Sequence, residues 1–308
     1  MAIFGVKLPG LVPGYAPSFR ELADLVVEFE RLGVDDVVDG EHILFSADMH
    51  HPGGSGNMVH GRSTQRSDRA DTIVVFATIA ARTSRIGMMS GILLAAAHGF
   101  AVLARQAATL DVVSGGRFAM GVGGGWNEAE FAAMGIPPRE RGARTEEVIR
   151  ACRELWSPGP STFEGATVRF ADVVSEPAPL TPCGPPVWWG GDGTKAATAR
   201  RVVELGAGWL SREAADHDEV ARSLETIRAA CVRAGRDPAS VGYRTSVLPT
   251  GDWRPGMSPA EITDRAVAHT ARLGTLGVTH FTIPLNYFRL GLDELGDLLA
   301  ALRGAVRA

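Results

Sequence analysis

Residues 85–121 read RIGMMSGILLAAAHGFAVLARQAATLDVVSGGRFAMG. The apolar run from Arg85 to Leu94 predicts a buried strand, and a second strand is predicted for Arg117 to Gly121. Between them, Gly99 to Val113 is predicted to be a helix, which ends at the glycines that follow Ser114. Two strands joined by a helix are typical of a parallel βαβ unit.

The alternation of strands and helices extends through the rest of the chain. Apolar residues at a spacing of three or four mark the helices, and capping boxes begin two of them, at Ser18–Glu21 and Ser258–Glu261. The pattern gives eight strand–helix units in 308 residues, a usual length for one barrel. This alternation fits a closed barrel better than an open sheet, although the pattern alone allows both. We therefore expect one α/β domain over residues 1–308, folded as a (β/α)8 TIM barrel with insertions after strands two and four. The other barrel strands are predicted at residues 3–6, 34–39, 186–189, 207–210, 241–248 and 278–283.

Two long segments interrupt this alternation. Residues 43–69 are polar and rich in Gly and His, and residues 157–186 are rich in Pro and Gly. Both are expected to leave the barrel from the C-terminal ends of its strands, where such barrels carry their active-site loops. The first segment is interpreted as a lid. Its histidines His50, His51 and His60 are interpreted as solvated, because the glycines among them do not fix a ligand spacing, and no metal is expected.

Composition limits the class of protein. With 45% hydrophobic residues, 21% charged residues and a net charge of −4, the chain is typical of a soluble protein and does not favour nucleic acid as a partner. No apolar stretch approaches the roughly 18 residues of a membrane span. The three cysteines, Cys152, Cys183 and Cys231, are far apart and form no C-x-x-C motif. Because no signal segment precedes the first strand, we expect a cytoplasmic protein with a small-molecule substrate.

Residues that could bind or react with a ligand follow the second and third strands. Asp39-Gly40-Glu41-His42 ends the second strand, and an imidazole placed there could exchange a proton with a bound ring. The alternative is a histidine that only caps the strand end. Gly91-Ile92 ends the third strand, where a glycine allows either the close approach of a planar ligand or a simple kink.

Two glycine-rich turns follow the fourth and fifth strands. The segment Gly121–Glu128 exposes backbone amides without side-chain bulk, which suits a ligand pressed against the main chain, although its spacing is not that of a dinucleotide fingerprint. A flexible loop is the other interpretation. The segment Gly190–Lys195 meets a helix N-terminus, so free backbone donors, the helix dipole and a lysine predict a phosphate site. A helix cap formed by Asp192 or Thr194 is the alternative.

As an ordered set, these motifs resemble the luciferase-like monooxygenase family, over Ile3–Trp209 strongly and over the remainder by topology. The resemblance implies a barrel oxidoreductase that binds FMN or coenzyme F420 and usually forms a homodimer. The Trp126-Asn127-Glu128 context and the arginine-rich composition favour the F420-dependent branch. The segments that carry the resemblance are Arg85–Leu94, Leu103–Asp111, Ser114–Arg117, Gly121–Gly123, Trp126-Asn127, Glu130-Phe131 and Pro186–Trp209.

The resemblance also implies roles for single residues. Glu41 and His42 match the family's acidic-His pair, in which the histidine contacts the reactive ring face, so His42 is the expected catalytic residue. Gly91-Ile92 match the position of a non-proline cis peptide bond that bulges against the central ring of the cofactor. The full set of expected cofactor-binding residues is Glu41, Gly91, Ile92, Val122, Gly123, Asn127, Gly190, Gly191, Gly193 and Thr194.

One position departs from the pattern. Some F420-dependent sugar-phosphate dehydrogenases have a catalytic glutamate where this chain has Gly124, and the only lysines are Lys7 and Lys195, so glucose 6-phosphate is not expected as the substrate. The leading hypothesis is hydride transfer between F420 and a small, largely apolar organic substrate. The alternatives are an FMN-dependent monooxygenase that uses reduced flavin and O2, and a flavin-binding homologue without catalysis.

Overall fold

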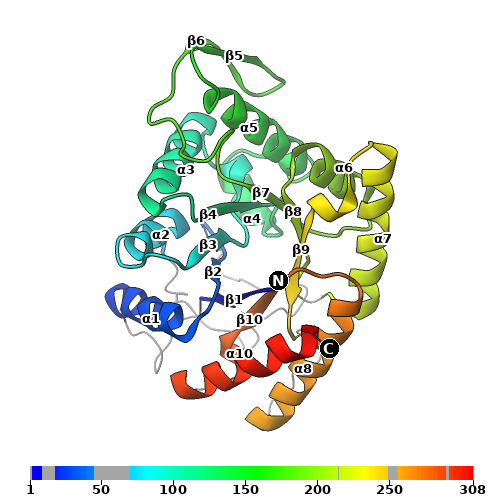
Figure 1. Ribbon diagram of the computed structural model, residues 1–308. Coiled ribbons are helices and arrows are strands. Elements are labelled where there is room, and N and C mark those ends of the chain that lie inside the picture. The colour runs from blue at the N-terminus through cyan, green and yellow to red at the C-terminus, as the bar shows by residue number, and fades with distance from the viewer. Residues whose placement is uncertain are drawn as a thin grey trace.

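Eight strands form a closed barrel in which every neighbouring pair is parallel, and helices surround the barrel (Figure 1). The order around the barrel is β1-β10-β9-β8-β7-β4-β3-β2. This arrangement confirms the predicted (β/α)8 barrel. The computed structural model describes residues 2–8, 18–44, 70–213, 215–248, 256–288 and 291–307.

The elements are short strands and longer helices that alternate along the chain. The barrel strands are β1 (Ile3–Lys7), β2 (Asp36–Asp39), β3 (Gly87–Ser90), β4 (Phe118–Val122), β7 (Val187–Gly190), β8 (Gly208–Leu210), β9 (Gly242–Ser246) and β10 (His280–Pro284). The α-helices are α1 (Phe19–Leu32), α2 (Thr72–Ala80), α3 (Phe100–Ser114), α4 (Glu128–Ala133), α5 (Arg141–Leu155), α6 (Ala196–Leu205), α7 (His217–Arg233), α8 (Pro259–Thr275), α9 (Leu285–Phe288) and α10 (Leu292–Arg307). Two 3-10 turns, η2 (Ala95–Ala97) and η3 (Pro238–Ser240), and an antiparallel hairpin of β5 (Ser161–Glu164) and β6 (Arg169–Val173) complete the described chain.

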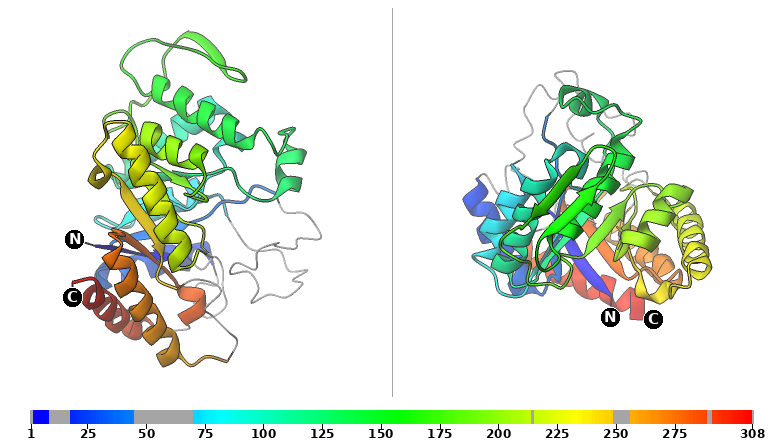
Figure 2. Two further views of the ribbon diagram at one scale, coloured as in Figure 1. Left: turned by 90° about the vertical axis from the view of Figure 1, so that its right-hand side faces the viewer. Right: turned by 90° about the horizontal axis from the view of Figure 1, so that it is seen from above.

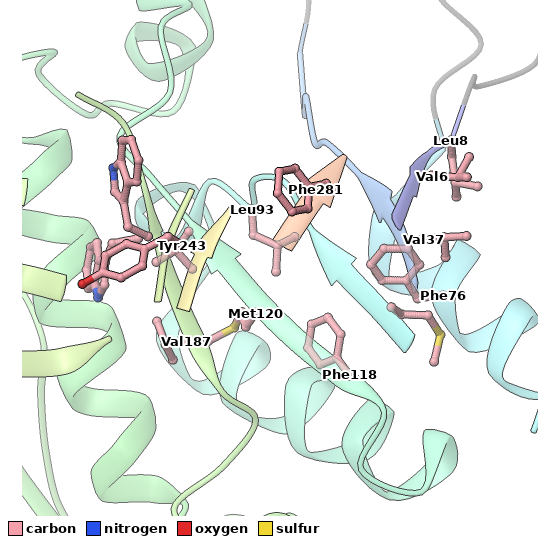
Figure 3. Packing of buried hydrophobic residues seen from close by; sticks show 14 of the residues in the cluster. Val6, Leu8, Val37, Phe76, Leu93, Phe118, Met120, Val187, Tyr243 and Phe281 are labelled. Atoms are coloured by element: carbon pink, nitrogen blue, oxygen red, sulfur yellow. The ribbon is translucent and has the colours of Figure 1, made fainter. Parts of the chain in front are cut away.

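Side chains alternate between the two faces of each barrel strand. Phe4 and Val6 of β1 are fully buried among side chains from the surrounding helices, in a large hydrophobic cluster. Figure 3 shows part of this cluster, which includes Phe118 of β4 and Phe281 of β10. The layer between barrel and helices is therefore the main core. None of the helices in the described parts of the chain is long and apolar enough to span a bilayer.

A second, smaller cluster lies inside the barrel, and Trp188 is its largest side chain. Gly208 of β8 and Gly242 of β9 make room for this ring, because a Cβ on either glycine would overlap the indole. The neighbouring Trp189 faces the opposite way, into the layer between barrel and helices, where the Arg201 guanidinium lies 5.8 Å from the centre of its ring. The buried members of the inner cluster are Val38, Met89, Trp188 and Leu210.

A buried ion pair crosses the barrel interior. Arg244 of β9 is 2% exposed and donates from Nη2 to both carboxylate oxygens of Asp36 on β2 at 2.7 Å. Gly5 of β1 makes room for the pair, because a Cβ there would overlap the Asp36 carboxylate. Burial and the positive charge of Arg244 lower the pKa of His280 to about 3. His280 is therefore neutral at physiological pH, and its ring meets Trp188 edge-on with centroids 4.7 Å apart.

The third strand is shorter than predicted. β3 covers Gly87–Ser90 rather than Arg85 to Leu94, and the apolar residues that follow it bend away into η2. The ladder ends because the N–H of Leu93 donates to the carbonyl of Gly121 across a single isolated bridge instead of continuing a regular register. An apolar run alone does not distinguish such a buried bend from a strand.

The second insertion lies between the barrel strands β4 and β7, as predicted, but the expectation that it leaves from the C-terminal ends of the strands is wrong. The insertion follows α5, which has already returned the chain to the N-terminal ends of the strands. Thr181 within it donates from its N–H and its hydroxyl to the buried carboxylate of Asp111, near the end of α3 and just before β4. Figure 1 and the left view of Figure 2 show the β5–β6 hairpin standing outside the barrel, beyond α5. The strand pair predicted near residues 162–170 is confirmed. The hairpin itself packs outside the barrel against α5 and the start of α3, where the Phe170 ring stacks on the Phe100 ring with centroids 5.3 Å apart.

We expect Gly242→Ala to lower the free energy of unfolding by about 1–3 kcal/mol, the usual cost of overpacking a core, because the new methyl group would overlap the Trp188 ring. Gly304→Ala in α10 is the control. A Cβ at Gly304 meets no atom within 4 Å, so this change should keep or raise stability by roughly 0.5–1 kcal/mol. Urea unfolding followed by circular dichroism measures both, and equal effects would contradict the placement of Trp188 beside Gly242.

Candidate active site

The four strand ends singled out from the sequence lie side by side. β2, β3, β4 and β7 are consecutive around the barrel, and Asp39 pairs in register with Ser90. Val122 likewise lies opposite Trp189, one residue before Gly190. The candidate segments that follow these residues therefore form one arc of the C-terminal rim of the barrel.

A bend at Gly91-Ile92 occupies the middle of this arc, and its peptide bond is cis, as the resemblance implied. The N–H of Gly91 donates to the Asp39 carbonyl at 2.6 Å, and the Ile92 carbonyl accepts from the N–H of Glu41 at 3.0 Å. The N–H of Leu93, the residue after the bend, donates to the Gly121 carbonyl at 2.8 Å. The bend is thus held by the end of β2 on one side and by β4 on the other.

Glycines on three neighbouring strand ends leave space for this bend. A Cβ on Gly123 would lie 2.5 Å from Cδ1 of Ile92, and a Cβ on Gly190 would lie 2.8 Å from Cγ2 of Ile92. A Cβ on Gly40 would lie 2.9 Å from the Gly91 carbonyl oxygen. The Ile92 side chain therefore fills the space that side chains on Gly123 and Gly190 would need.

Glu41 contacts the bend and the residues after it, and it is 7% exposed. Its Oε2 accepts from the N–H of Leu94 at 2.8 Å, and His98 Nε2 lies 2.9 and 3.0 Å from its two oxygens. Burial disfavours the charged form of His98, but the hydrogen bond and charge of Glu41, with a smaller contribution from Asp71, outweigh it and raise the pKa of His98. In the structure, Glu41 thus ties the end of β2 to the segment that follows the bend.

His42 lies at the rim between the end of β2 and α4. Its Nδ1 is 3.1 Å from Oε2 of Glu130, and its ring meets Trp126 edge-on with centroids 5.3 Å apart. Oε1 of Glu130 also accepts from the N–H groups of Ile43 and Leu44. The side chains of His42 and Glu130 are 14% and 1% exposed. One ring nitrogen of the expected catalytic residue is therefore held by a buried carboxyl group.

Asn127 and Val122, two of the expected cofactor contacts, have structural partners. Asn127 caps α4: its side chain accepts from the N–H of Glu130 at 3.4 Å and donates to the Leu44 carbonyl at 3.3 Å. The Val122 side chain is fully buried in the large hydrophobic cluster. Asn127 therefore fixes the helix that carries Glu130, whereas Val122 belongs to the core through its side chain.

The turn Gly190–Thr194 leads into α6. The indole N–H of Trp209 donates to the Gly191 carbonyl at 3.0 Å, and Gly193 packs against Ser223, whose Cβ would lie 2.6 Å from a Cβ on that glycine. A Cβ on Gly191 would meet no atom within 4 Å, so this side of the turn is open. Trp209 and Ser223 therefore contact one side of the turn, whereas the side at Gly191 is open and could accept a bound group.

The sequence allowed either a phosphate site or a helix cap at the start of α6, and the structure has features compatible with each. Oδ1 of Asp192 accepts from the N–H and the hydroxyl of Thr194 at 3.0 and 2.6 Å, as expected for a local cap. The helix itself begins after Lys195 without a side-chain cap. The hydrogen bonds from Thr194, together with the charges of Lys195 and Arg212, lower the pKa of Asp192. An anion at this turn would thus meet donors of α6 and one carboxylate beside them.

The sequence did not single out Arg141, the first residue of α5. The atoms nearest to a Cβ on Gly124 all belong to Arg141, beginning with Cγ at 3.6 Å. Its guanidinium lies 5.8 Å from the centre of the Phe131 ring, and Nη1 is buried without a hydrogen-bond partner. A buried guanidinium nitrogen beside the glycine-rich turn is a donor for an anionic group. An arginine that begins a helix has no motif, so periodicity could not identify it.

The role of Glu130 was also missed, although the residue carried part of the resemblance. The spacing Asn127-x-x-Glu130 is that of a capping box, in which the carboxylate turns back to its own helix start. Here the Asn127 half is present, but the carboxyl group of Glu130 contacts residues 42–44 instead. The Asn127-x-x-Glu130 spacing was therefore visible in the sequence, but the residue that Glu130 contacts, His42, lies more than 80 positions earlier in the chain.

The expected lid, residues 43–69, lies outside the described residues apart from Ile43 and Leu44. Its histidines His50, His51 and His60 lie outside them as well. Among the residues that the structure does describe, no group of three or more His, Cys, Asp or Glu side chains is placed to hold a metal ion.

Known sequences and structures resemble this chain over different lengths. The family described as luciferase-like monooxygenase matches residues 3–284. An uncharacterised protein of Mycobacterium tuberculosis is 34% identical over 59% of this chain and 63% of its own length. The FMNH2-dependent dimethylsulfone monooxygenase of Pseudomonas putida is 29% identical over 58% of this chain and 48% of its own length. The alignments thus span less than two thirds of these curated relatives.

Solved structures with the same fold include enzymes of two kinds. An F420-dependent secondary alcohol dehydrogenase in complex with an F420–acetone adduct has a TM-score of 0.74 and 17% identity, and covers 98% of this chain and 99% of its own. The monooxygenase RslO1 from Streptomyces bottropensis has a TM-score of 0.72 and 20% identity, and covers 99% of this chain and 98% of its own. At these identities the similarity shows the fold alone.

We expect His98→Gln to destabilise the protein more at pH 6 than at pH 8.5. Because the pKa of His98 is raised in the folded protein, its pairing with Glu41 stabilises the fold fully below the ordinary histidine pKa of about 6.5, and this stabilisation is lost as pH rises through the folded-state pKa. Urea unfolding of both proteins at the two pH values measures the difference. A destabilisation that does not change with pH would contradict a charged His98–Glu41 pair.

Proposed function

This chain belongs to the luciferase-like monooxygenase family of oxidoreductases, and on that basis we propose that it transfers hydride between coenzyme F420 and a small organic substrate, with His42 exchanging the accompanying proton. The position of His42 carries this proposal. The residue follows Glu41, whose N–H is bonded to the Ile92 carbonyl, so His42 comes directly after a residue that contacts the bend at Gly91-Ile92. A planar ring on that bend would face a histidine held by a buried carboxyl group.

Bound F420 would supply a carrier for two electrons in the form of hydride. Reduction of a carbonyl compound to an alcohol also consumes one proton, and the reverse reaction releases one. Histidine is the side chain whose ordinary titration lies closest to physiological pH, which suits it to exchange that proton in either direction. His42 is partly accessible at the rim, with 14% of its side chain exposed.

The residues at the rim fit a ring system that carries a phosphate group. The bend at Gly91-Ile92 would support the ring, with Gly123 and the backbone of Val122 beside it. The turn Gly190–Thr194 would hold the phosphate. The buried and unpaired Nη1 of Arg141 is the observation that tests this fit, because it offers a donor for an anion and has no other partner.

The substrate proposed for this site is small and largely apolar. Neither lysine at the rim is placed for a second phosphate. Lys7, at the end of β1, donates to both carboxylate oxygens of Glu213 at 2.8 Å, and Lys195 lies 3.9 Å from Asp192. This arrangement supports the expectation that a sugar phosphate is not the substrate.

Reduced FMN with O2 is the second candidate. The 29% identity with the dimethylsulfone monooxygenase and the 30% identity with pyrimidine monooxygenases favour it, because those relatives are named for oxygen chemistry. A phosphate site at Gly190–Thr194 is compatible with either cofactor. A flavin-binding homologue without catalysis is the third possibility and would bind a cofactor without turnover.

We also propose a homodimer in the cytoplasm. Exposed valines on two adjacent helices support the dimer, because Val102 and Val113 of α3 are 58% and 52% exposed and Val74 of α2 is 60% exposed. α2 and α3 lie next to one another on the same side of the barrel (Figure 1). Apolar side chains that face outward together are typical of a protein–protein contact.

A fluorescence titration of the purified protein with F420 and with FMN tests the choice of cofactor. Much tighter binding of F420 is the expected result. Tighter binding of FMN would overturn the proposal in favour of oxygen chemistry, and binding of neither cofactor would contradict both.

We expect Arg141→Met to weaken the binding of the preferred cofactor by about 10-fold or more, since a hydrogen bond to a charged group contributes roughly 1.5–3 kcal/mol. Arg139→Met is the matched control, because that arginine lies two residues away and its side chain is 87% exposed. Isothermal titration calorimetry measures both affinities. If the two variants bind equally well, Arg141 does not contact the cofactor phosphate.

We expect His42→Gln to lower kcat by roughly 100-fold, the lower end of the usual contribution of a general acid or base. The dissociation constant of the cofactor should remain close to that of the unmodified protein, because the bend and the phosphate turn stay in place. Steady-state kinetics with the preferred cofactor and calorimetry give the two quantities. Unchanged kcat would remove His42 from the reaction.

A further inference from the structure

We infer that Glu130 is a positioning residue that keeps a proton on Nδ1 of His42 and thereby presents Nε2 as the atom that exchanges a proton with the substrate. The placement of the proton on the ring follows from the contacts alone. Its importance for turnover rests on the function proposed above. Glu130 lies on α4, 88 positions after His42 in the sequence, so the pair joins two separate strand-end segments of the rim.

The two carboxyl oxygens of Glu130 have different partners. Oε1 accepts from the backbone N–H groups of Ile43 and Leu44, the latter at 3.0 Å. Oε2 lies 3.1 Å from Nδ1 of His42. Because a backbone N–H can only donate, Oε1 is fixed as an acceptor, and this fixes which oxygen faces the imidazole.

The carboxyl group is almost completely removed from water. The Glu130 side chain is 1% exposed, compared with 14% for His42. A carboxylate in this state needs its hydrogen bonds, because a buried charge without partners is costly. Nδ1 of His42 is the donor placed at its second oxygen, so the proton belongs on Nδ1 rather than on the carboxyl group.

The surrounding contacts hold the ring in this orientation. Asn127 caps α4 and also donates to the carbonyl of Leu44, so the helix and residues 42–44 are joined twice. Trp126 meets the His42 ring edge-on, at an interplanar angle of 75°. With Nδ1 engaged by Glu130, the neutral imidazole carries its acceptor lone pair on Nε2.

The first test uses the unmodified protein. Nitrogen-15 NMR of protein labelled at its eight histidines distinguishes a protonated ring nitrogen from an unprotonated one, and the His42→Gln spectrum identifies the signals of His42. We expect a proton on Nδ1 at every pH at which the protein is folded. An unprotonated Nδ1 would overturn the inference, whatever the activity of the protein.

Glu130→Gln tests whether Glu130 keeps the proton on Nδ1 of His42. The change keeps the volume of the side chain and replaces the acceptor that faces His42 with a donor. The N–H groups of Ile43 and Leu44 require the amide oxygen at the Oε1 position, so the NH2 group must face His42 and donate to Nδ1. We expect the proton of the neutral ring to move to Nε2. A ring that keeps its proton on Nδ1 in this variant would show that Glu130 does not determine the tautomer. Glu128→Gln is the matched control, since Glu128 is an exposed residue of the same short helix.

Kinetics then separate positioning from folding. We expect Glu130→Gln to lower kcat by roughly 100-fold, as for loss of the imidazole itself, with KM and cofactor affinity within about threefold of the unmodified protein. A purely structural role would instead weaken cofactor binding together with kcat. If the tautomer changes in Glu130→Gln while kcat stays unchanged in both Glu130→Gln and His42→Gln, Glu130 positions the ring as inferred and the function proposed for His42 is wrong.

Discussion

The close approach of backbones around Ile92 is the constraint on which the candidate site depends. The bend at Gly91-Ile92 occupies space that side chains on Gly123 and Gly190 would need, and its carbonyl lies against Gly40. Glycine is the only residue that leaves this space open. The glycine-rich turns are therefore first of all a packing requirement of three neighbouring strand ends. Their exposed amides, and with them the capacity to bind a ligand, follow from that packing.

Two buried glutamates at the rim each contact both the backbone and a histidine ring. Glu41 accepts from the N–H of Leu94 and from His98, and Glu130 accepts from the N–H groups of residues 43 and 44 and contacts His42. Each buried carboxyl group thus fixes a piece of irregular backbone and one imidazole at the same time. Loops at a barrel rim lack ladder hydrogen bonds, so side-chain acceptors of this kind supply the missing partners.

The alternation of apolar runs was sufficient to predict parallel strands joined by helices, because each strand–helix unit is local in the sequence. It favoured a closed barrel over an open sheet without excluding the sheet, and the resemblance implied the barrel. The bend at Gly91-Ile92 was predictable only through the resemblance, since an apolar run such as Ile92–Leu94 is equally compatible with a strand. The partner of Glu130 could not be predicted, because the contact spans 88 positions. The side of the barrel taken by residues 157–186 was predictable in principle. An insertion that follows a helix leaves the barrel from the opposite end to one that follows a strand.

Arg141, beside Gly124, places a positive charge at this part of the rim. The nearest side chain to the Cβ position of Gly124 is Arg141. By the resemblance, Gly124 is the position at which some F420-dependent sugar-phosphate dehydrogenases carry a glutamate. A guanidinium does not release its proton at physiological pH, so it cannot act as the acid or base there. It can only attract and orient negative charge. In the proposed function, proton exchange therefore belongs to His42, on the other side of the bend, and the pairing inferred between His42 and Glu130 would determine which ring nitrogen takes part.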